Sequence, residues 1–236
     1  MMKDANTNEK KPFWFQGLTL IVIALITAAA WIFVELADEV IEKETHTFDT
    51  RILLAMRDKD NLSDPWGPEW FEELFRDMTA LGGVGVLALI TAACIGGLLI
   101  SGRRKTALLI LFAVFGGVVL SLIFKSGFDR PRPDLVPHGS YVYTKSFPSG
   151  HAMISTVTYL TLGFLMAGTY KSKIIRGYII AVALVIAGLV GLSRIYLGVH
   201  WPTDVLAGWA LGSAWALLCW LFYYRLRQTG KIEHPA

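Results

Sequence analysis

Charged side chains are scarce in this chain. Asp, Glu, Lys and Arg make up only 17% of its 236 residues, whereas hydrophobic residues make up 54%. An ordinary soluble domain carries about a quarter of its residues as these four charged types. The imbalance argues against a soluble globular protein and predicts that much of the chain has lipid as its solvent.

Cysteine and processing signals are scarce as well. Cys94 and Cys219 both lie in apolar stretches, which indicates small buried hydrophobes rather than a disulfide or a metal site. The first apolar run has no cleavage pattern of small residues after it, so we expect no cleavable signal peptide. No internal repeat or linker divides the chain. We therefore expect one domain over residues 1–236, with residues 1–12 disordered.

Long apolar runs are what the sequence has instead. A bilayer core of about 30 Å is crossed by about 20 helical residues. Six runs meet this length, and they predict an all-α, polytopic membrane protein with six transmembrane helices in a bundle. The runs are Phe15–Val34, Ala80–Ile100, Thr106–Phe124, Ala152–Thr169, Ile174–Leu192 and Val205–Tyr224.

The distribution of charge between the runs predicts their direction. One set of flanks, which includes both termini, holds 12 basic and 3 acidic residues, a net charge of +9. The opposite flanks hold 10 basic and 16 acidic residues, a net charge of −6. Basic residues accumulate on the cytoplasmic side of membrane proteins. We therefore expect an inner-membrane protein with both termini in the cytoplasm.

The first outer segment, residues 35–79, is acidic but carries apolar side chains at helical spacing. Phe48 and Ile52 share one helical face, and Trp66 and Trp70 stand close to the membrane. Tryptophan is enriched at membrane interfaces. The pattern predicts interfacial helices that form an outer cap, and it leaves open whether this cap is only structural or also guides a substrate.

Three short clusters, all between residues 125 and 204, combine charge with histidine at outer ends of the predicted spans. They supply three cations from three separate segments, Lys125, Arg132 and Arg194. Converging cations require an anion, and guanidinium groups match phosphate oxygens in two-point contacts. Ser149 and Gly150 stand where a helix begins, which is a favourable place for an anion. The cluster predicts a phosphate-binding pocket.

Two histidines predict that this pocket is catalytic. His200 and Asp204 are four residues apart after a predicted helix start, so the carboxylate can hold one imidazole nitrogen and leave the other free to attack. His151 stands at another helix start and can act as the general acid. These roles predict in-line attack on phosphorus and a phosphohistidine intermediate. No carboxylate cluster with metal-site spacing occurs among the motifs, so we expect neither a metal nor another cofactor.

Together the clusters resemble a known signature. Lys-x6-Arg-Pro (Lys125 to Pro133), Pro-Ser-Gly-His (Pro148 to His151) and Ser-Arg-x5-His-x3-Asp (Ser193 to Asp204) are similar to the three motifs of the type-2 phosphatidic-acid phosphatase superfamily, with no departure at any signature position. The resemblance implies that His200 is the nucleophile, Asp204 its orienter and His151 the acid. It assigns the phosphate shell to Lys125, Arg132, Ser149, Gly150 and Arg194.

The motifs recognise phosphate and do not mark the lipid. The six-span form resembles bacterial phosphatases of undecaprenyl diphosphate, phosphatidylglycerophosphate or phosphatidic acid, and an outward-facing site favours the first. A lipid A phosphatase stays open as an alternative. A vanadium haloperoxidase is disfavoured by the six spans, and an anion or lipid transporter would leave both histidines without a purpose. The expected partner is a phospholipid or polyprenyl phosphate in the bilayer, with no nucleic acid and no obligatory protein partner.

Overall fold

A computed structural model describes residues 13–140 and 144–232, so the disorder expected for residues 1–12 lies outside the described residues. Regular structure in the described part consists of helices and one isolated bridge between Arg57 and Pro65. The helices are α1 (Phe13–Ile41), α2 (His46–Ala55), α3 (Glu69–Ala80), α4 (Val84–Ile100), α5 (Arg104–Gly127), α6 (Gly150–Ala167), α7 (Lys173–Tyr196) and α8 (Pro202–Gln228). The expectation of an all-α protein is confirmed.

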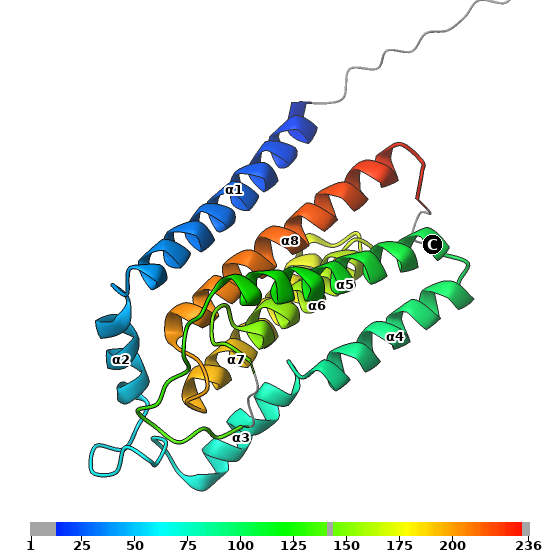
Figure 1. Cartoon of the computed structure of the whole chain (residues 1–236). Coiled ribbons are helices and arrows are strands. Elements are labelled where there is room, and N and C mark those ends of the chain that lie inside the picture. The colour runs from blue at the N-terminus through cyan, green and yellow to red at the C-terminus, as the bar shows by residue number, and fades with distance from the viewer. Residues whose placement is uncertain (1–12, 141–143, 233–236) are drawn as a thin grey trace, which may run out of the picture.

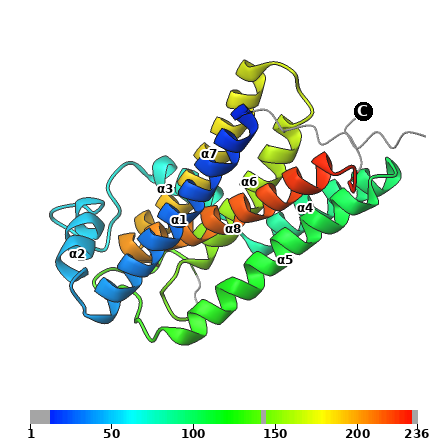
Figure 2. The same ribbon diagram turned by 90° about the horizontal axis from the view of Figure 1, so that it is seen from above.

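The long helices form a bundle around α6. This helix contacts α5, α7 and α8, whereas α1 packs on α8 and α4 packs on α5 (Figures 1 and 2). Accordingly, 56% of the most apolar window of α6 is buried within the protein, against 17% of that of α1. The residues that open α6 therefore start from the middle of the bundle.

Five of the helices, α1, α5, α6, α7 and α8, are long and apolar enough to cross a bilayer, and α3 with α4 forms a sixth, bent pair. The bend is 48° and falls at residues 81–83, so helix α4 of the expected Ala80–Ile100 run begins at Val84. Gly82 and Gly83 lie at the break, and the Tyr159 hydroxyl donates to the carbonyl oxygen of Leu81 at 2.8 Å. This bond satisfies a backbone group that the interrupted helix leaves unpaired.

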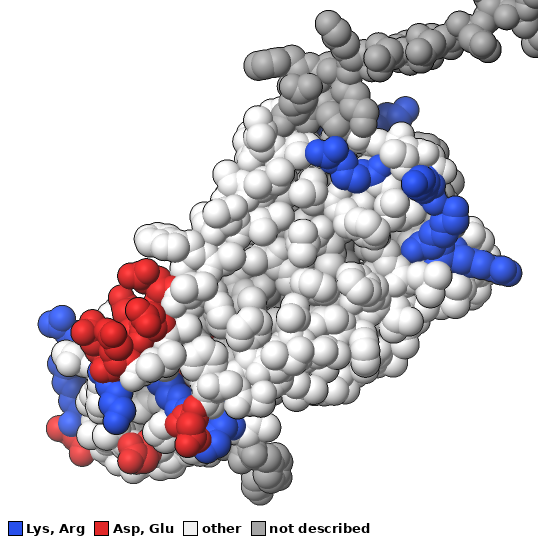
Figure 3. Space-filling view, turned by 45° about the horizontal axis from the view of Figure 1, so that its top comes forward, with Lys and Arg blue, Asp and Glu red and all other residues white. Residues whose placement is uncertain are grey.

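The surface shows a wide uncharged band between two charged ends. On the face in Figure 3, the acidic side chains gather at one end, while the other end carries basic side chains. Exposed apolar residues such as Leu20, Phe115 and Ile174 cover the outer faces of α1, α5 and α7. In water such an area would be unfavourable, but it matches a hydrocarbon environment. The chain is a multi-pass membrane protein.

The segment between α1 and α4 forms a cap at the acidic end of the bundle. Helix α3 packs on α7, and α2 contacts the start of α8. Trp66 and Trp70 are 62% and 67% exposed, which suits an interfacial position. The buried side chains of α2 are Asp49 and Leu53, so an acidic residue faces the protein interior.

Candidate active site

The three sequence clusters meet at the capped end of the bundle. Lys125 lies in the last turn of α5, Ser149 precedes α6, Arg194 lies in the last turn of α7, and His200 precedes α8. Pro202 occupies the first turn of α8, where its missing N–H costs no hydrogen bond. The backbone N–H of Ser149 donates to the carbonyl oxygen of residue 204 at 2.9 Å. This bond fixes the starts of α6 and α8 against each other.

His200 and Asp204 form the expected pair. Nδ1 of His200 lies 3.2 Å from Oδ2 of Asp204, and both side chains are buried. The same carboxylate oxygen accepts the backbone N–H of Trp201 at 2.9 Å and the hydroxyl of Ser146. Since a carboxylate only accepts, Nδ1 of His200 carries the proton and Nε2 is the free base.

The surroundings keep His200 neutral. Burial lowers the pKa of His200 from 6.5 to about 3; Asp204 opposes this shift, and the positive charges of Arg132 and Arg194 add to it. Nε2 of His200 faces Nη1 of Arg132 at 3.1 Å. The unprotonated nitrogen therefore points at a cation of the predicted phosphate shell, which is the orientation that a nucleophile needs.

The predicted phosphate shell contains three cations, Lys125, Arg132 and Arg194. Within the described residues, each of them hydrogen-bonds only to uncharged groups. Lys125 donates to the hydroxyl of Thr144 at 2.9 Å and to the carbonyl oxygen of Lys145 at 3.0 Å. Arg132 donates to the carbonyl oxygens of Thr144 at 2.8 Å and Val199 at 2.6 Å. A concentration of positive charge without a nearby carboxylate partner favours binding of an anion.

Arg194 likewise has no charged partner among the described residues. Its residue surface is only 2% exposed, and Nη1 donates to the hydroxyl of Thr79 at 2.9 Å. Its Nε atom is buried and has no hydrogen-bond partner in the part of the chain that the structure describes. A buried donor without an acceptor is costly, and a phosphate oxygen would satisfy it.

The helix start at Ser149 completes the cluster. Ser149 is fully buried and its hydroxyl accepts the backbone N–H of Ala152 at 3.5 Å. A Cβ placed on Gly150 would lie 3.4 Å from Cε of Lys125, so the lysine passes close to the helix start. His151 lies within electrostatic range of His200 and of all three cations. The structure thus brings all eight sequence-predicted residues into one cluster.

Several residues of this cluster were not predicted. Thr79 of α3 and Thr144 hold the cations, and Ser146 holds Asp204. Asp49 of α2 contacts Arg130, a residue of the first cluster to which the sequence assigned no role. Only Arg130 carried a signal, because it is a second arginine in the Arg130-Pro-Arg132 string; the other four are ordinary polar residues in the sequence.

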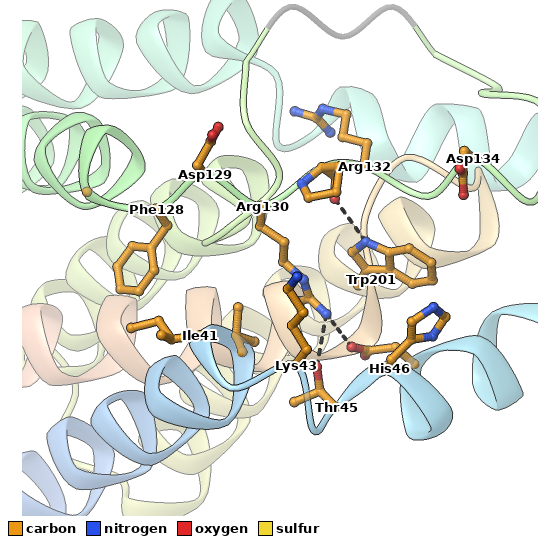
Figure 4. A pocket seen from close by; sticks show the side chains of 14 residues that line it. Ile41, Lys43, Thr45, His46, Phe128, Asp129, Arg130, Arg132, Asp134 and Trp201 are labelled. Carbon is orange, nitrogen blue, oxygen red and sulfur yellow. Dashed lines mark hydrogen bonds and ion pairs between the residues drawn. The ribbon is translucent and has the colours of Figure 1, made fainter.

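Two cavities border the cluster. One of about 540 Å³ lies between the outer end of α1, α2 and residues 127–134 (Figure 4). Another of about 510 Å³ is bordered by Lys125 and Thr144. Arg130, Pro131 and Arg132 line both. Among the described residues, no three His, Cys, Asp or Glu side chains gather closely enough to hold a metal ion.

Comparison with known proteins agrees with this geometry. The chain is 34% identical over 147 residues to phosphatidylglycerophosphatase B of Bacillus subtilis, which covers 61% of this chain and 70% of that protein. It is 32% identical over 143 residues to an undecaprenyl-diphosphatase of Sulfolobus acidocaldarius, which covers 58% and 62%. The crystal structure of a transmembrane PAP2-type phosphatidylglycerolphosphate phosphatase of Bacillus subtilis superposes with a TM-score of 0.68 at 26% identity, over 87% of this chain and 96% of that chain.

The match to a family model includes all three sequence clusters. Residues 106–228, from α5 to the end of α8, match the model of the PAP2 superfamily. This range contains the three sequence clusters and the helices that position them. The chain therefore belongs to the PAP2 superfamily.

Proposed function

We propose that this chain, a membrane lipid phosphatase, cleaves its substrate through a covalent phosphohistidine. Nε2 of His200 attacks phosphorus and forms the N–P bond while the P–O bond to the leaving group breaks. His151 gives its proton to the leaving oxygen. Water then attacks phosphorus, His151 takes a proton from that water, and the N–P bond breaks to restore neutral His200.

The observation that carries this proposal is a cluster of three cations without carboxylate ion-pair partners, one of which, Arg132, lies 3.1 Å from Nε2 of His200. Lys125, Arg132 and Arg194 are placed to hold the nonbridging oxygens and to offset the charge that they gain in the transition state. Ser149 and the backbone N–H of Gly150 add hydrogen-bond donors at the helix start. These groups supply the positive charge that a divalent ion provides in other phosphoryl-transfer enzymes, so we propose a metal-independent reaction.

For the substrate and the side of the membrane, charge and resemblance support one combined proposal. The acidic end carries the site, and the opposite flanks carry the net charge of +9, which supports cytoplasmic termini and a site that faces the periplasm or exterior of the inner membrane. A lipid phosphate there lies at headgroup depth. Undecaprenyl diphosphate is our first candidate, followed by phosphatidylglycerophosphate and phosphatidic acid, with lipid A as the alternative.

Phosphate release by the purified protein in detergent tests the function. We expect release from at least one of these four lipids in the presence of EDTA, and less than about 0.1% of that rate in His200→Ala. Rapid quenching with labelled substrate should trap a phosphoenzyme that is stable in base and labile in acid, as a phosphoramidate is. Activity that requires added magnesium, or an equal amount of phosphoenzyme in His200→Ala, would contradict the mechanism.

A further inference from the structure

A buried chain of ion pairs links the cap to the nucleophile pair. Arg130 donates through Nη1 to Oδ1 of Asp204 at 2.6 Å and through Nη2 to Oδ2 of Asp49 at 2.5 Å. Both carboxylates are fully buried, and the arginine side chain is 12% exposed. Figure 4 shows Arg130 reaching from residues 127–134 toward Thr45, whose hydroxyl accepts from Nη2 at 3.0 Å. The two terminal nitrogens of the guanidinium group, Nη1 and Nη2, thus bind one carboxylate each.

The first residues of α8 complete this network. Thr203 donates its backbone N–H to Oδ1 of Asp49 at 2.9 Å and its hydroxyl to Oδ2 at 2.7 Å. Nη1 of Arg130 also contacts that hydroxyl at 2.8 Å. Both carboxylate oxygens of Asp49 are therefore hydrogen-bonded. Two of these bonds come from Thr203, the residue that immediately precedes Asp204. Removing a partner from such a buried network leaves an uncompensated charge.

The network divides the two oxygens of Asp204 between two tasks. Oδ1 is held by Arg130, whereas Oδ2 is held by His200, Ser146 and the backbone of Trp201. The direction of Oδ2, and so the orientation of the imidazole, depends on where Oδ1 is fixed. Arg130 is the residue that fixes it, and Asp49 fixes Arg130 from the opposite side.

The charges of Asp49, Arg130 and Asp204 also affect the electrostatic field at His200. The ring of His200 becomes cationic when Nε2 bonds to phosphorus, and a negative Asp204 stabilises that form. Arg130 alone would offset the charge of Asp204, because it lies 2.6 Å away in a buried environment. Asp49 restores the balance: the two carboxylates and one guanidinium have a net charge of −1. Asp49 thus maintains the negative field at His200 while Arg130 supplies the geometry.

We propose that Asp49 of the cap helix α2 is a positioning residue of the reaction, which acts through Arg130 on Asp204. The proposal rests on His200 as the nucleophile. It assigns the outer cap a part in the chemical step, in addition to covering the bundle. Its effect belongs to turnover rather than to substrate binding, because Asp49 lies behind Arg130 and Asp204 and not among the phosphate-facing cations.

A double-mutant cycle in the full-length protein tests the proposal. We expect Asp49→Asn to lower kcat about tenfold and to change KM less than twofold, with a short-chain lipid phosphate as substrate. In an Asp204→Asn background the same change should lower kcat less than twofold, because the residue through which Asp49 acts is already altered. Asp77→Asn removes the same charge from an exposed position of the cap and should leave kcat unchanged.

The outcomes separate positioning from folding and from the proposed function. A wild-type kcat in Asp49→Asn, a loss confined to KM, or an equal loss in the Asp204→Asn background would each overturn the proposal. If Asp49→Asn does not fold in detergent, Thr203→Val removes hydroxyl contacts to both Asp49 and Arg130 without changing charge, and it should show the same non-additivity. His200→Ala is assayed alongside: full activity there would overturn the nucleophile assignment itself.

Discussion

The two arginines on either side of Pro131 differ in the charge of their partners. Arg130 is held by the carboxylates of Asp49 and Asp204, whereas Arg132 contacts carbonyl oxygens, a hydroxyl and Nε2 of His200. Burial lowers the pKa of Arg132, and the charge of Asp204 opposes that shift. An arginine whose charge is already balanced serves structure, and one whose charge is not balanced is available to a phosphate. Residue type alone does not distinguish the two roles.

His151 has a test that depends on its role as the acid. If it protonates the leaving oxygen, His151→Ala should slow phosphoenzyme formation from an alkyl lipid phosphate by about 10²- to 10⁴-fold. The loss should be much smaller with 4-nitrophenyl phosphate, because nitrophenolate leaves without a proton. Single-turnover rapid-quench measurements with both substrates report this step directly.

His46→Gln changes an exposed histidine of the cap and should leave both rates unchanged. An equal loss with the two substrates in His151→Ala would show that this histidine does not protonate the leaving group.

At the scale of helices, the site depends on how closely α8 approaches α6. A Cβ on Gly208 would lie 2.7 Å from the carbonyl oxygen of Ser149 and 3.0 Å from Cβ of Ala152. Glycine at this position lets the two backbones come together, as small residues do in membrane bundles. The start of α6, where the proposed phosphate ligands Ser149 and Gly150 lie, is thereby placed beside the His200–Asp204 pair. The contact between the helices therefore sets the geometry of the candidate site.

Gly208→Ala tests this contact. The added methyl group must displace the backbone at Ser149, so we expect turnover to fall at least tenfold and stability in detergent to fall by about 1–3 kcal/mol. Initial rates and a thermal denaturation curve measure the two effects. Gly188→Ala in α7, where the added Cβ has no atom within 4 Å, is the matched control. Unchanged activity in Gly208→Ala would show that the close approach does not position the site.

On the scale of the whole molecule, the two ends of the bundle differ in charge. The cap, the candidate active-site cluster and 16 of the 19 acidic residues belong to one set of flanks. The opposite flanks are basic (Figure 3). An imbalance of this size orients helices during membrane insertion, and short loops follow it most closely.

Cysteine labelling tests the orientation that this imbalance predicts. In a background with Cys94→Ala and Cys219→Ala, we place single cysteines by Lys59→Cys in the cap and Lys173→Cys at the start of α7; both positions are exposed. An impermeant thiol reagent should label the first variant on intact cells and the second only after permeabilisation. The reverse pattern would place the site in the cytoplasm and remove the argument for an outward-facing carrier lipid.

The sequence by itself determined the membrane class and the helical fold, and it predicted the residues of the candidate site. Spans can be identified locally, because about 20 apolar residues match the bilayer wherever they occur. The eight predicted site residues lie in three short strings, so pattern and spacing were sufficient to propose them as one group, and the fold brings them together. The acidic and aromatic composition of residues 35–79 also predicted a cap.

Only the tertiary structure decided how these parts are connected. Asp49 and Thr203 are separated by 154 positions in the chain, and Thr79 and Arg194 by 115. No local pattern encodes such pairs, because any buried carboxylate can in principle satisfy any arginine that the fold brings near it. The bend at residues 81–83 was missed for a related reason: its free carbonyl is satisfied by Tyr159, from another helix. Hydrophobicity and motif spacing are local properties of the chain, whereas the pairing of buried polar groups is set by packing.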